Sequence, residues 1–208
     1  MRIATVTVAL TAVALAGCAS SMSKNECRTV DWRTVGYEDG VAGRSGSRIA
    51  QHRKSCAAAG VSTDLDAYQR GRAEGLREYC QPENGFRAGL NGQTYGGYCA
   101  ADLAEDFTLA YESGQELRER RVRLNTVNSR LSYVHRETAR LENRITSAGL
   151  VIVDGKTTSE QRAQALLDVK HMVELRERLQ GEIPQLESDR RRYQFELDEY
   201  RTRIAYRD

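Results

Sequence analysis

The second half of the chain alternates apolar and charged residues with the period of a coiled coil. From 117 to 145 apolar residues recur every seven positions, a second series follows three positions later, and Thr138 is the polar exception. A further run from 169 to 204 steps by three and four, and Arg176 and Arg190 interrupt it. Glu and Arg fill the other positions, as on coiled-coil surfaces. The pattern predicts two long amphipathic helices.

A breaker segment separates the two runs. It extends from Ser147 to Lys156 and contains two glycines, and one of residues 157–159 can cap the helix that follows. Two helices with a short connection form an antiparallel hairpin, with arms of roughly 50 Å for about 35 residues each. Pro184 lies inside the second run, where we expect it to kink the helix or to divide it near Gly181.

Four consecutive apolar residues lie at the predicted end of this hairpin: Leu150, Val151, Ile152 and Val153. Their exposure to water would be unfavourable. Two interpretations stay open at this point. The four residues fold back against the hairpin, or they form a docking tip for a partner or for another copy of the chain.

Glycine marks a different kind of structure in the first half. Twelve of the 17 glycines lie between Gly36 and Gly97. Many follow an aromatic residue and recur at intervals of three or four, which places them along one face of a helix. Because glycine within a helix costs up to about 1 kcal/mol relative to alanine, we interpret these faces as sites where another helix approaches closely. The glycine-rich motifs of phosphate-binding loops are not present.

The same half is expected to form short helices. Asp64 is suited to cap one of them, and Pro82–Gly85 reads as a turn. The expected helices are Trp32–Gly43, Ser47–Ala59, Asp64–Tyr79, Phe86–Gly92 and Leu103–Gly114.

The N-terminus has the pattern of a secretory signal. Arg2 precedes an uncharged stretch from 3 to 16, which is too short to span a membrane. The sequence Leu15-Ala16-Gly17-Cys18 then resembles the lipobox of bacterial lipoproteins. The resemblance implies cleavage before Cys18 and acylation of that residue, palmitate included, and several acyl chains hold a protein stably at a membrane. Residue 19 is Ala, not the Asp of inner-membrane retention, so the resemblance favours the outer membrane.

Four further cysteines are present: Cys27, Cys56, Cys80 and Cys99. An even number in an exported protein indicates two disulfides. A zinc site is the alternative, but no Cys-x-x-Cys pair occurs. We favour Cys80 with Cys99, which enclose a turn-rich segment, and consequently Cys27 with Cys56.

Composition argues against several classes of function. The 31 basic and 29 acidic residues give a net charge of +2, which provides no overall attraction to nucleic acid. The three histidines occur in no metal-binding motif. His135 and His171 are expected to be solvated, and so is His52, with a basic patch at His52-Arg53-Lys54 as the alternative. Asp31, Asp39, Asp64 and Asp66 are expected in caps and turns. We therefore predict no catalytic residue, no metal and no cofactor.

An ordered set of motifs resembles a known family. It begins with Asp31-Trp32-Arg33-Thr34-Val35-Gly36-Tyr37-Glu38-Asp39-Gly40 and continues with Ile49-Ala50-Gln51-His52. It ends with Tyr68, Gly71, Gly75 and Leu76, then Tyr79-Cys80, Pro82 and Asn84-Gly85. Together these resemble the bacterial lipoproteins of domain-of-unknown-function family 2799. The resemblance implies an exported lipoprotein without an assigned activity.

The sequence thus predicts an all-α protein with a small, disulfide-braced, glycine-rich head followed by a long antiparallel coiled-coil hairpin. The expected divisions are a signal peptide (1–17), a lipidated tether (18–26), the head (27–101) and the hairpin (102–208). The expected function is a non-catalytic interaction or scaffold role in the cell envelope, at the outer membrane and facing the periplasm. The expected partners are the membrane, through the lipid, and an envelope protein or a second copy, through the coiled coil. A peptidoglycan- or glycan-binding module is the alternative.

Overall fold

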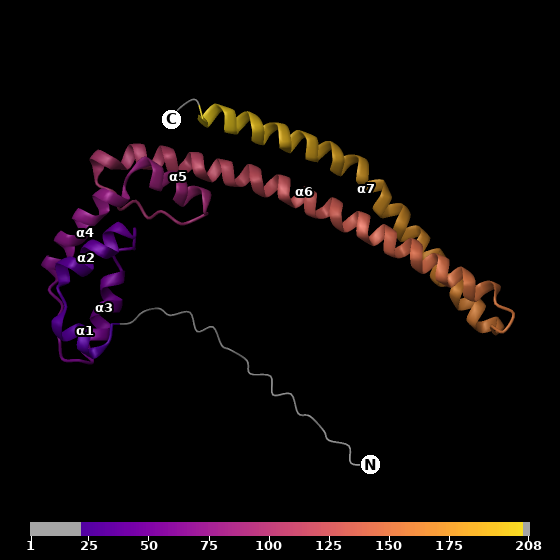
Figure 1. Ribbon diagram of the computed structural model, residues 1–208, viewed down its shortest axis with the longest axis horizontal. Coiled ribbons are helices and arrows are strands. Elements are labelled where there is room, and N and C mark those ends of the chain that lie inside the picture. Colours follow the sequence, from indigo (N-terminus) through magenta and orange to yellow (C-terminus); the bar gives the residue numbers. More distant parts are fainter. Residues whose placement is uncertain (1–21, 206–208) are drawn as a thin grey trace, which may run out of the picture. The chain divides into compact units, whose positions relative to one another are not determined.

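The computed structural model describes residues 22–205, in which every regular element is an α-helix (Figure 1). The predicted all-α class is confirmed. The signal peptide, Cys18 and Ala19 lie outside the described residues. The described chain forms two compact units. The first extends up to Tyr79 and includes Tyr98–Ala100, and the second contains Cys80–Gly97 and everything from Ala101 onward.

Four helices make up the first unit: α1 (Lys24–Thr29), α2 (Trp32–Val41), α3 (Arg48–Ala57) and α4 (Leu65–Tyr79). The last three were predicted, whereas α1 falls partly in the expected tether. It begins with a capping box: the Ser23 hydroxyl accepts from the Glu26 N–H, and the Glu26 carboxylate accepts from the Ser23 N–H at 2.7 Å. The hydrogen bond from the Ser23 backbone lowers the pKa of Glu26. The Ser-x-x-Glu motif at Ser23 and Glu26 is the sequence signal for the start of this helix.

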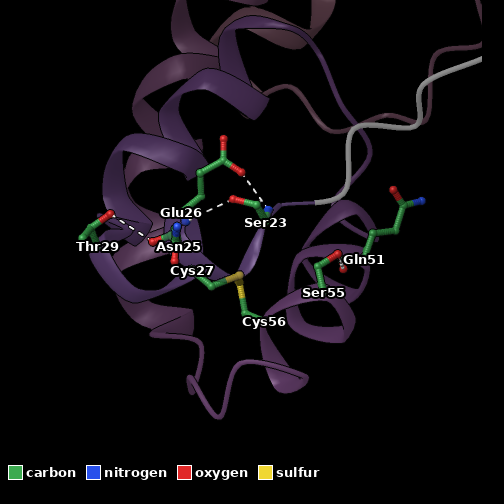
Figure 2. Close-up of a disulfide and its surroundings, with 8 residues drawn as sticks. All are labelled: Ser23, Asn25, Glu26, Cys27, Thr29, Gln51, Ser55 and Cys56. Carbon is green, nitrogen blue, oxygen red and sulfur yellow. Dashed lines mark hydrogen bonds between the residues drawn. A yellow bond between two sulfur atoms is a disulfide. The ribbon is translucent and has the colours of Figure 1, made fainter.

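A disulfide between Cys27 and Cys56 joins α1 to α3 (Figure 2). It lies in a core with Trp32 and Tyr68. Cys80 is paired with Cys99. Both predicted bridges are confirmed, and the pairing of all four thiols excludes the zinc-thiolate alternative.

Helices α2 and α4 pack backbone against backbone through glycine. A Cβ atom added to Gly36 or Gly40 would overlap the carbonyl oxygen of Tyr68 or Arg72, respectively. Cβ atoms on Gly71 and Gly75 would overlap the carbonyl oxygens of Arg33 and Tyr37. The residue numbers of contacting positions increase together along α2 and α4, so the two helices run in the same direction. We call α2 and α4 the first helix pair.

The second unit contains α5 (Pro82–Leu90), α6 (Ala101–Val153) and α7 (Ser159–Ala205). The predicted turn at Pro82–Gly85 is wrong, because Pro82 occupies the first turn of α5, where a missing N–H is harmless. The expected helix Leu103–Gly114 does not end at Gly114 but continues through it. That glycine contacts α5: a Cβ there would overlap the carbonyl oxygen of Phe86.

Helices α6 and α7 form the predicted antiparallel hairpin, lying side by side in Figure 1. The connection is shorter than expected, because α6 runs to Val153. Thr158 caps α7, since its hydroxyl accepts from the Gln161 N–H at 3.2 Å. Helix α7 is not divided near Gly181 but continues through Pro184. The buried seam comprises Leu117, Leu124, Val127, Leu131, Val134, Thr138, Leu141, Met172, Leu179, Leu197 and Tyr200.

The division between the units differs from the boundary expected at residue 101. Helix α5 packs on the start of α6, so it belongs with the hairpin. Cβ atoms on Gly85 and Gly89 would overlap the carbonyl oxygens of Phe107 and Tyr111. These contacts again run in one direction. We call α5 and residues 101–116 of α6 the second helix pair.

Candidate functional site

A buried polar cluster joins three helices of the first unit. Asp39 from α2, His52 from α3 and Tyr68 from α4 are 9%, 8% and 1% exposed. One oxygen of Asp39, Oδ2, lies 2.8 Å from His52 Nε2 and accepts a hydrogen bond of 2.8 Å from the Tyr68 hydroxyl. The three side chains satisfy one another, as buried polar groups must.

Each residue of the polar cluster is placed by the helix that carries it. Asp39 lies in the interior of α2, between the glycines that contact α4. His52 shares a face of α3 with Cys56, four residues on, which is held by its disulfide. Burial, followed by the hydrogen bond to Asp39, raises the pKa of Tyr68 far above its usual value. The hydroxyl therefore stays protonated and remains a donor.

A carboxylate that orients a histidine is also a part of many hydrolytic sites. Such a site needs a nucleophile beside the imidazole. Within residues 22–205 no serine, threonine or cysteine hydrogen-bonds to His52. Arg48 Nε lies 4.0 Å from Asp39 Oδ1, so a guanidinium accompanies the buried carboxylate. The arrangement is suited to fixing three helices in place.

Two predictions about the cluster were wrong. His52 is not part of a solvated basic patch: it is buried, while Arg53 and Lys54 are exposed. Asp39 is neither a cap nor a turn residue. In contrast, Asp31 caps α2 by accepting from the Arg33 N–H at 3.0 Å, and Asp64 caps α4. Ile49, His52 and Cys56 are spaced by three and four residues and so share one face of α3. This spacing is the sequence signal for burial of His52.

The second helix pair repeats the first without this cluster. Glycines of α2 recur 49 positions later in α5, as Gly36 and Gly85 show. Of the two α4 glycines, Gly75 recurs 39 positions later as Gly114 in α6, whereas the position equivalent to Gly71 is Ala110. Residues equivalent to Asp39 and Tyr68 are then Ala88 and Phe107. The pairs also end alike, because Gly43 and Gly92 both take a left-handed φ, 62° and 70°. The full set of equivalent contact glycines is Gly36 with Gly85, Gly40 with Gly89, Gly43 with Gly92, and Gly75 with Gly114.

Both pairs together occupy the stretch from the cap of α2 to just beyond Gly114. Residues 31–116 match the model of a family described as "Protein of unknown function (DUF2799)". The match confirms the resemblance of this segment to domain-of-unknown-function family 2799, and the lipobox-like sequence lies outside it. The DUF2799 segment therefore comprises two glycine-packed helix pairs. No curated protein and no solved structure matches the chain.

The hairpin beyond residue 116 lies outside the DUF2799 segment and includes the four apolar residues predicted at its end. They form the last turn of α6. Leu150 and Val153 are 67% and 77% exposed, Val151 is exposed as well, and Ile152 is half-buried. Three of the four thus face solvent within residues 22–205.

The remaining candidate residues of the sequence do not form a site within the described part of the chain. His135, His171 and Arg190–Arg192 are exposed, as expected. In the part of the chain that the structure describes, no three His, Cys, Asp or Glu side chains are grouped as metal ligands. Over the same residues, no helix combines the length and apolar character needed to cross a membrane.

Proposed function

We propose that this protein is a lipid-anchored, non-catalytic scaffold of the bacterial cell envelope. In this proposal acyl chains on Cys18 hold it at the outer membrane, facing the periplasm, and the α6/α7 hairpin is the part that reaches interaction partners. The anchor rests on the lipobox-like sequence Leu15-Ala16-Gly17-Cys18, because two or more acyl chains give stable membrane attachment.

The observation that carries the scaffold role is the closed hairpin. Helices of 53 and 47 residues pack along an apolar seam that contains two buried clusters. Only the first turns of α6 and the last turns of α7 contact α5. The remaining length is not needed to stabilise the DUF2799 segment, and it leaves an extended outer surface available to other molecules.

The polar side chains of the first unit favour a structural role over a glycan-binding groove. Besides the buried cluster, Arg33 pairs with Glu74 at 2.7 Å, and the Tyr37 hydroxyl donates to Glu78 at 2.6 Å. Aromatic and charged groups that would recognise a sugar are thus engaged with each other. Binding to purified cell wall remains the discriminating measurement for that alternative.

Two experiments in cells test the proposal. Metabolic labelling with an alkyne fatty acid should label the full-length chain and not Cys18→Ala, and the variant should leave the membrane fraction. Photo-crosslinking residues placed along the hairpin, at the positions of Val122, Tyr133 and Leu175, should give discrete protein adducts. An unlabelled wild-type chain would refute the anchor, and a hairpin without adducts would refute the scaffold.

A further inference from the structure

The end of the hairpin carries exposed aliphatic side chains on both helices. Leu150, Val151 and Val153 of α6 are joined by Leu166 and Leu167 near the start of α7, which are 55% and 54% exposed. We call these five residues the apolar end. Aliphatic side chains offer no hydrogen-bonding group, so a contact that covers them gains from their removal from water alone.

The seam of the hairpin does not require these residues. In this part of the molecule the seam is made by Leu141 and Met172, with Ile145, Ala148 and Val169 packed against them. The apolar end therefore lies outside the contact that holds α6 to α7. Its exposure is a property of the surface and is not explained by the packing of the hairpin.

A row of arginines leads to the apolar end along α6. Arg136, Arg140 and Arg144 are exposed and four residues apart, so they share one face. Arg140 lies 3.2 Å from Glu137, whereas Arg136 and Arg144 form no ion pair with any residue in 22–205. From Arg144 to Val151 the helix rises about 10 Å. Cationic groups are thus placed just behind the aliphatic ones.

The size of the apolar end indicates what kind of surface covers it. Five partly exposed aliphatic side chains on a convex end fall short of the roughly 800 Å² that each partner buries in a stable protein interface. A lipid bilayer does not have this limitation, because acyl chains conform to any shape and anionic headgroups attract arginine.

We propose that the apolar end inserts into the surface of a lipid bilayer, with the arginine row against anionic headgroups. Lys156 in the connecting loop adds a further cation, while Asp154 accepts a hydrogen bond from the Lys156 N–H and shapes the loop. This inference goes beyond the proposed scaffold and is independent of the lipid on Cys18. It gives the hairpin a membrane contact of its own.

Vesicle flotation tests the proposal with the unlipidated chain from Met22 onward, which contains every described helix. We expect it to float with vesicles of phosphatidylethanolamine and phosphatidylglycerol, and to float far less with phosphatidylcholine vesicles. Raising the salt concentration should reduce binding, because the headgroup attraction is screened. Absence of binding to the anionic vesicles would overturn the proposal, whatever the cellular labelling of Cys18 shows.

Paired variants assign the binding to the apolar end. Leu150→Ser/Val153→Ser should lower the bound fraction about tenfold or more, whereas Val122→Ser/Phe195→Ser removes exposed apolar groups elsewhere on the hairpin and should change nothing. Both pairs are exposed, so far-UV circular dichroism should show unaltered helix. Equal binding by the apolar-end variant and its control would reject the assignment.

The arginine row has a matched control as well. Arg136→Gln/Arg140→Gln/Arg144→Gln should weaken binding by about fivefold for each arginine that reaches the headgroups, and it should remove most of the salt dependence. The control substitutes three exposed arginines of the other helix, α7, namely Arg178, Arg190 and Arg191. Loss of binding in the control alone would contradict the proposal.

A spectroscopic and a hydrodynamic measurement complete the test. Val153→Trp should show a blue-shifted emission upon addition of anionic vesicles, and Phe195→Trp should not. Sedimentation equilibrium without lipid should give the same mass for the wild type and for Leu150→Ser/Val153→Ser. A mass that falls in the variant would show that a second copy covers the apolar end, and would overturn the lipid proposal.

Discussion

The two glycine-packed helix pairs share the same backbone contacts and differ in the side chains buried between their helices. In both, equivalent glycines let parallel helices meet at carbonyl oxygens of the neighbouring backbone. The first pair holds Asp39 and Tyr68 inside, tied to His52. The second has Ala88 and Phe107 at the equivalent positions, both buried. The glycine contact is therefore common to both pairs, and the polar cluster is found only in the first.

The outer faces differ in the same way. In the second pair Phe86 packs under the end of α7, against Leu117 and Leu197. The equivalent residues of Phe86 and Leu117 in the first pair are Tyr37 and Glu78, which hydrogen-bond to each other at the surface. The face that is covered in the second pair is therefore solvated in the first. The first pair gains its burial on the other side instead, from α1 and α3.

The comparison shows how one motif is stabilised in two settings. A glycine contact removes side chains from the interface, so each pair needs burial from another source. The first pair relies on a disulfide, a polar cluster and short helices. The second relies on a long helix that covers it. The following experiments test this division, from the largest expected effect to the smallest.

Adding a methyl group at equivalent glycines should damage the two pairs alike. Gly75→Ala and Gly114→Ala each place a Cβ against a backbone carbonyl, so each should lower the free energy of unfolding of its pair by about 3 kcal/mol or more. Emission of Trp32, the only tryptophan, reports on the first unit during urea unfolding, and amide hydrogen exchange of α5 reports on the second.

A glycine without neighbours provides the control. Nothing lies within 4 Å of a Cβ added at Gly181 in α7. Gly181→Ala should therefore raise helix stability by up to about 1 kcal/mol. A loss at Gly181, or tolerance at only one of the two contact glycines, would break the equivalence of the pairs.

Removing the Cys27–Cys56 disulfide should destabilise the first helix pair and leave the second unchanged. Cys27→Ser/Cys56→Ser frees a segment with a sequence separation of 29, and the first unit should lose about 3–4 kcal/mol through the greater entropy of its unfolded state. Hydrogen exchange of α5 should be unchanged. Equal destabilisation of both units would mean that they unfold together.

Removing the buried carboxylate should lower the stability of the first pair, because it breaks hydrogen bonds that have no equivalent in the second. Asp39→Ala leaves His52 and the Tyr68 hydroxyl without their partner, at a cost of about 2–4 kcal/mol. Asp39→Ala/Tyr68→Phe reproduces the interior of the second pair and should recover about 1 kcal/mol of that loss. If the double variant is less stable than Asp39→Ala, the hydroxyl has another role.

High pH should act on the first pair through Tyr68. Its pKa is raised by burial, so the folded state favours the protonated hydroxyl more than the unfolded state does. The resulting stability is complete below the unfolded pKa of about 10 and is lost as the pH rises above it. Urea unfolding followed by the Trp32 emission maximum should show this decline, and Tyr68→Phe should flatten it.

The alkaline experiment needs Tyr37→Phe as its control. The hydrogen bond to Glu78 also raises the pKa of Tyr37, so this exposed tyrosine contributes a slope of its own. The steeper slope should belong to Tyr68. An unchanged slope in Tyr68→Phe would remove the buried hydroxyl from the explanation.

Periodic features were predictable from the sequence. The heptad positions from Leu117 to Ile204 contain the seam, the cysteine count indicated both disulfides, and glycine spacing identified the close helix contacts. Each of these signals is local or involves one repeated residue type. Cys18 and the signal peptide, by contrast, stay predictions.

Features that depend on distant contacts were missed. Burial of His52 and Asp39 follows from Tyr68, which lies on another helix, and charged neighbours such as Arg53 made the segment look solvated. The sequence predicts a helix end at Gly114, yet α6 continues through it and α5 occupies the space that the glycine leaves. The sequence predicts a turn at Pro82, but the first turn of a helix also accepts proline, and Pro82 begins α5.

The unbroken course of α6 through Gly114 restricts how the chain can change in length. Residues around that glycine contact α5 and α7 at once, because the Ser113 carbonyl accepts from the Tyr200 hydroxyl and Leu117 packs in one cluster with Phe86 and Leu197. No loop lies between these contacts to absorb a shift. An insertion of two residues would rotate the seam by about 200°, whereas seven residues in each arm would preserve it and add about 10 Å. The length of the hairpin can therefore change only in steps of one heptad in each arm.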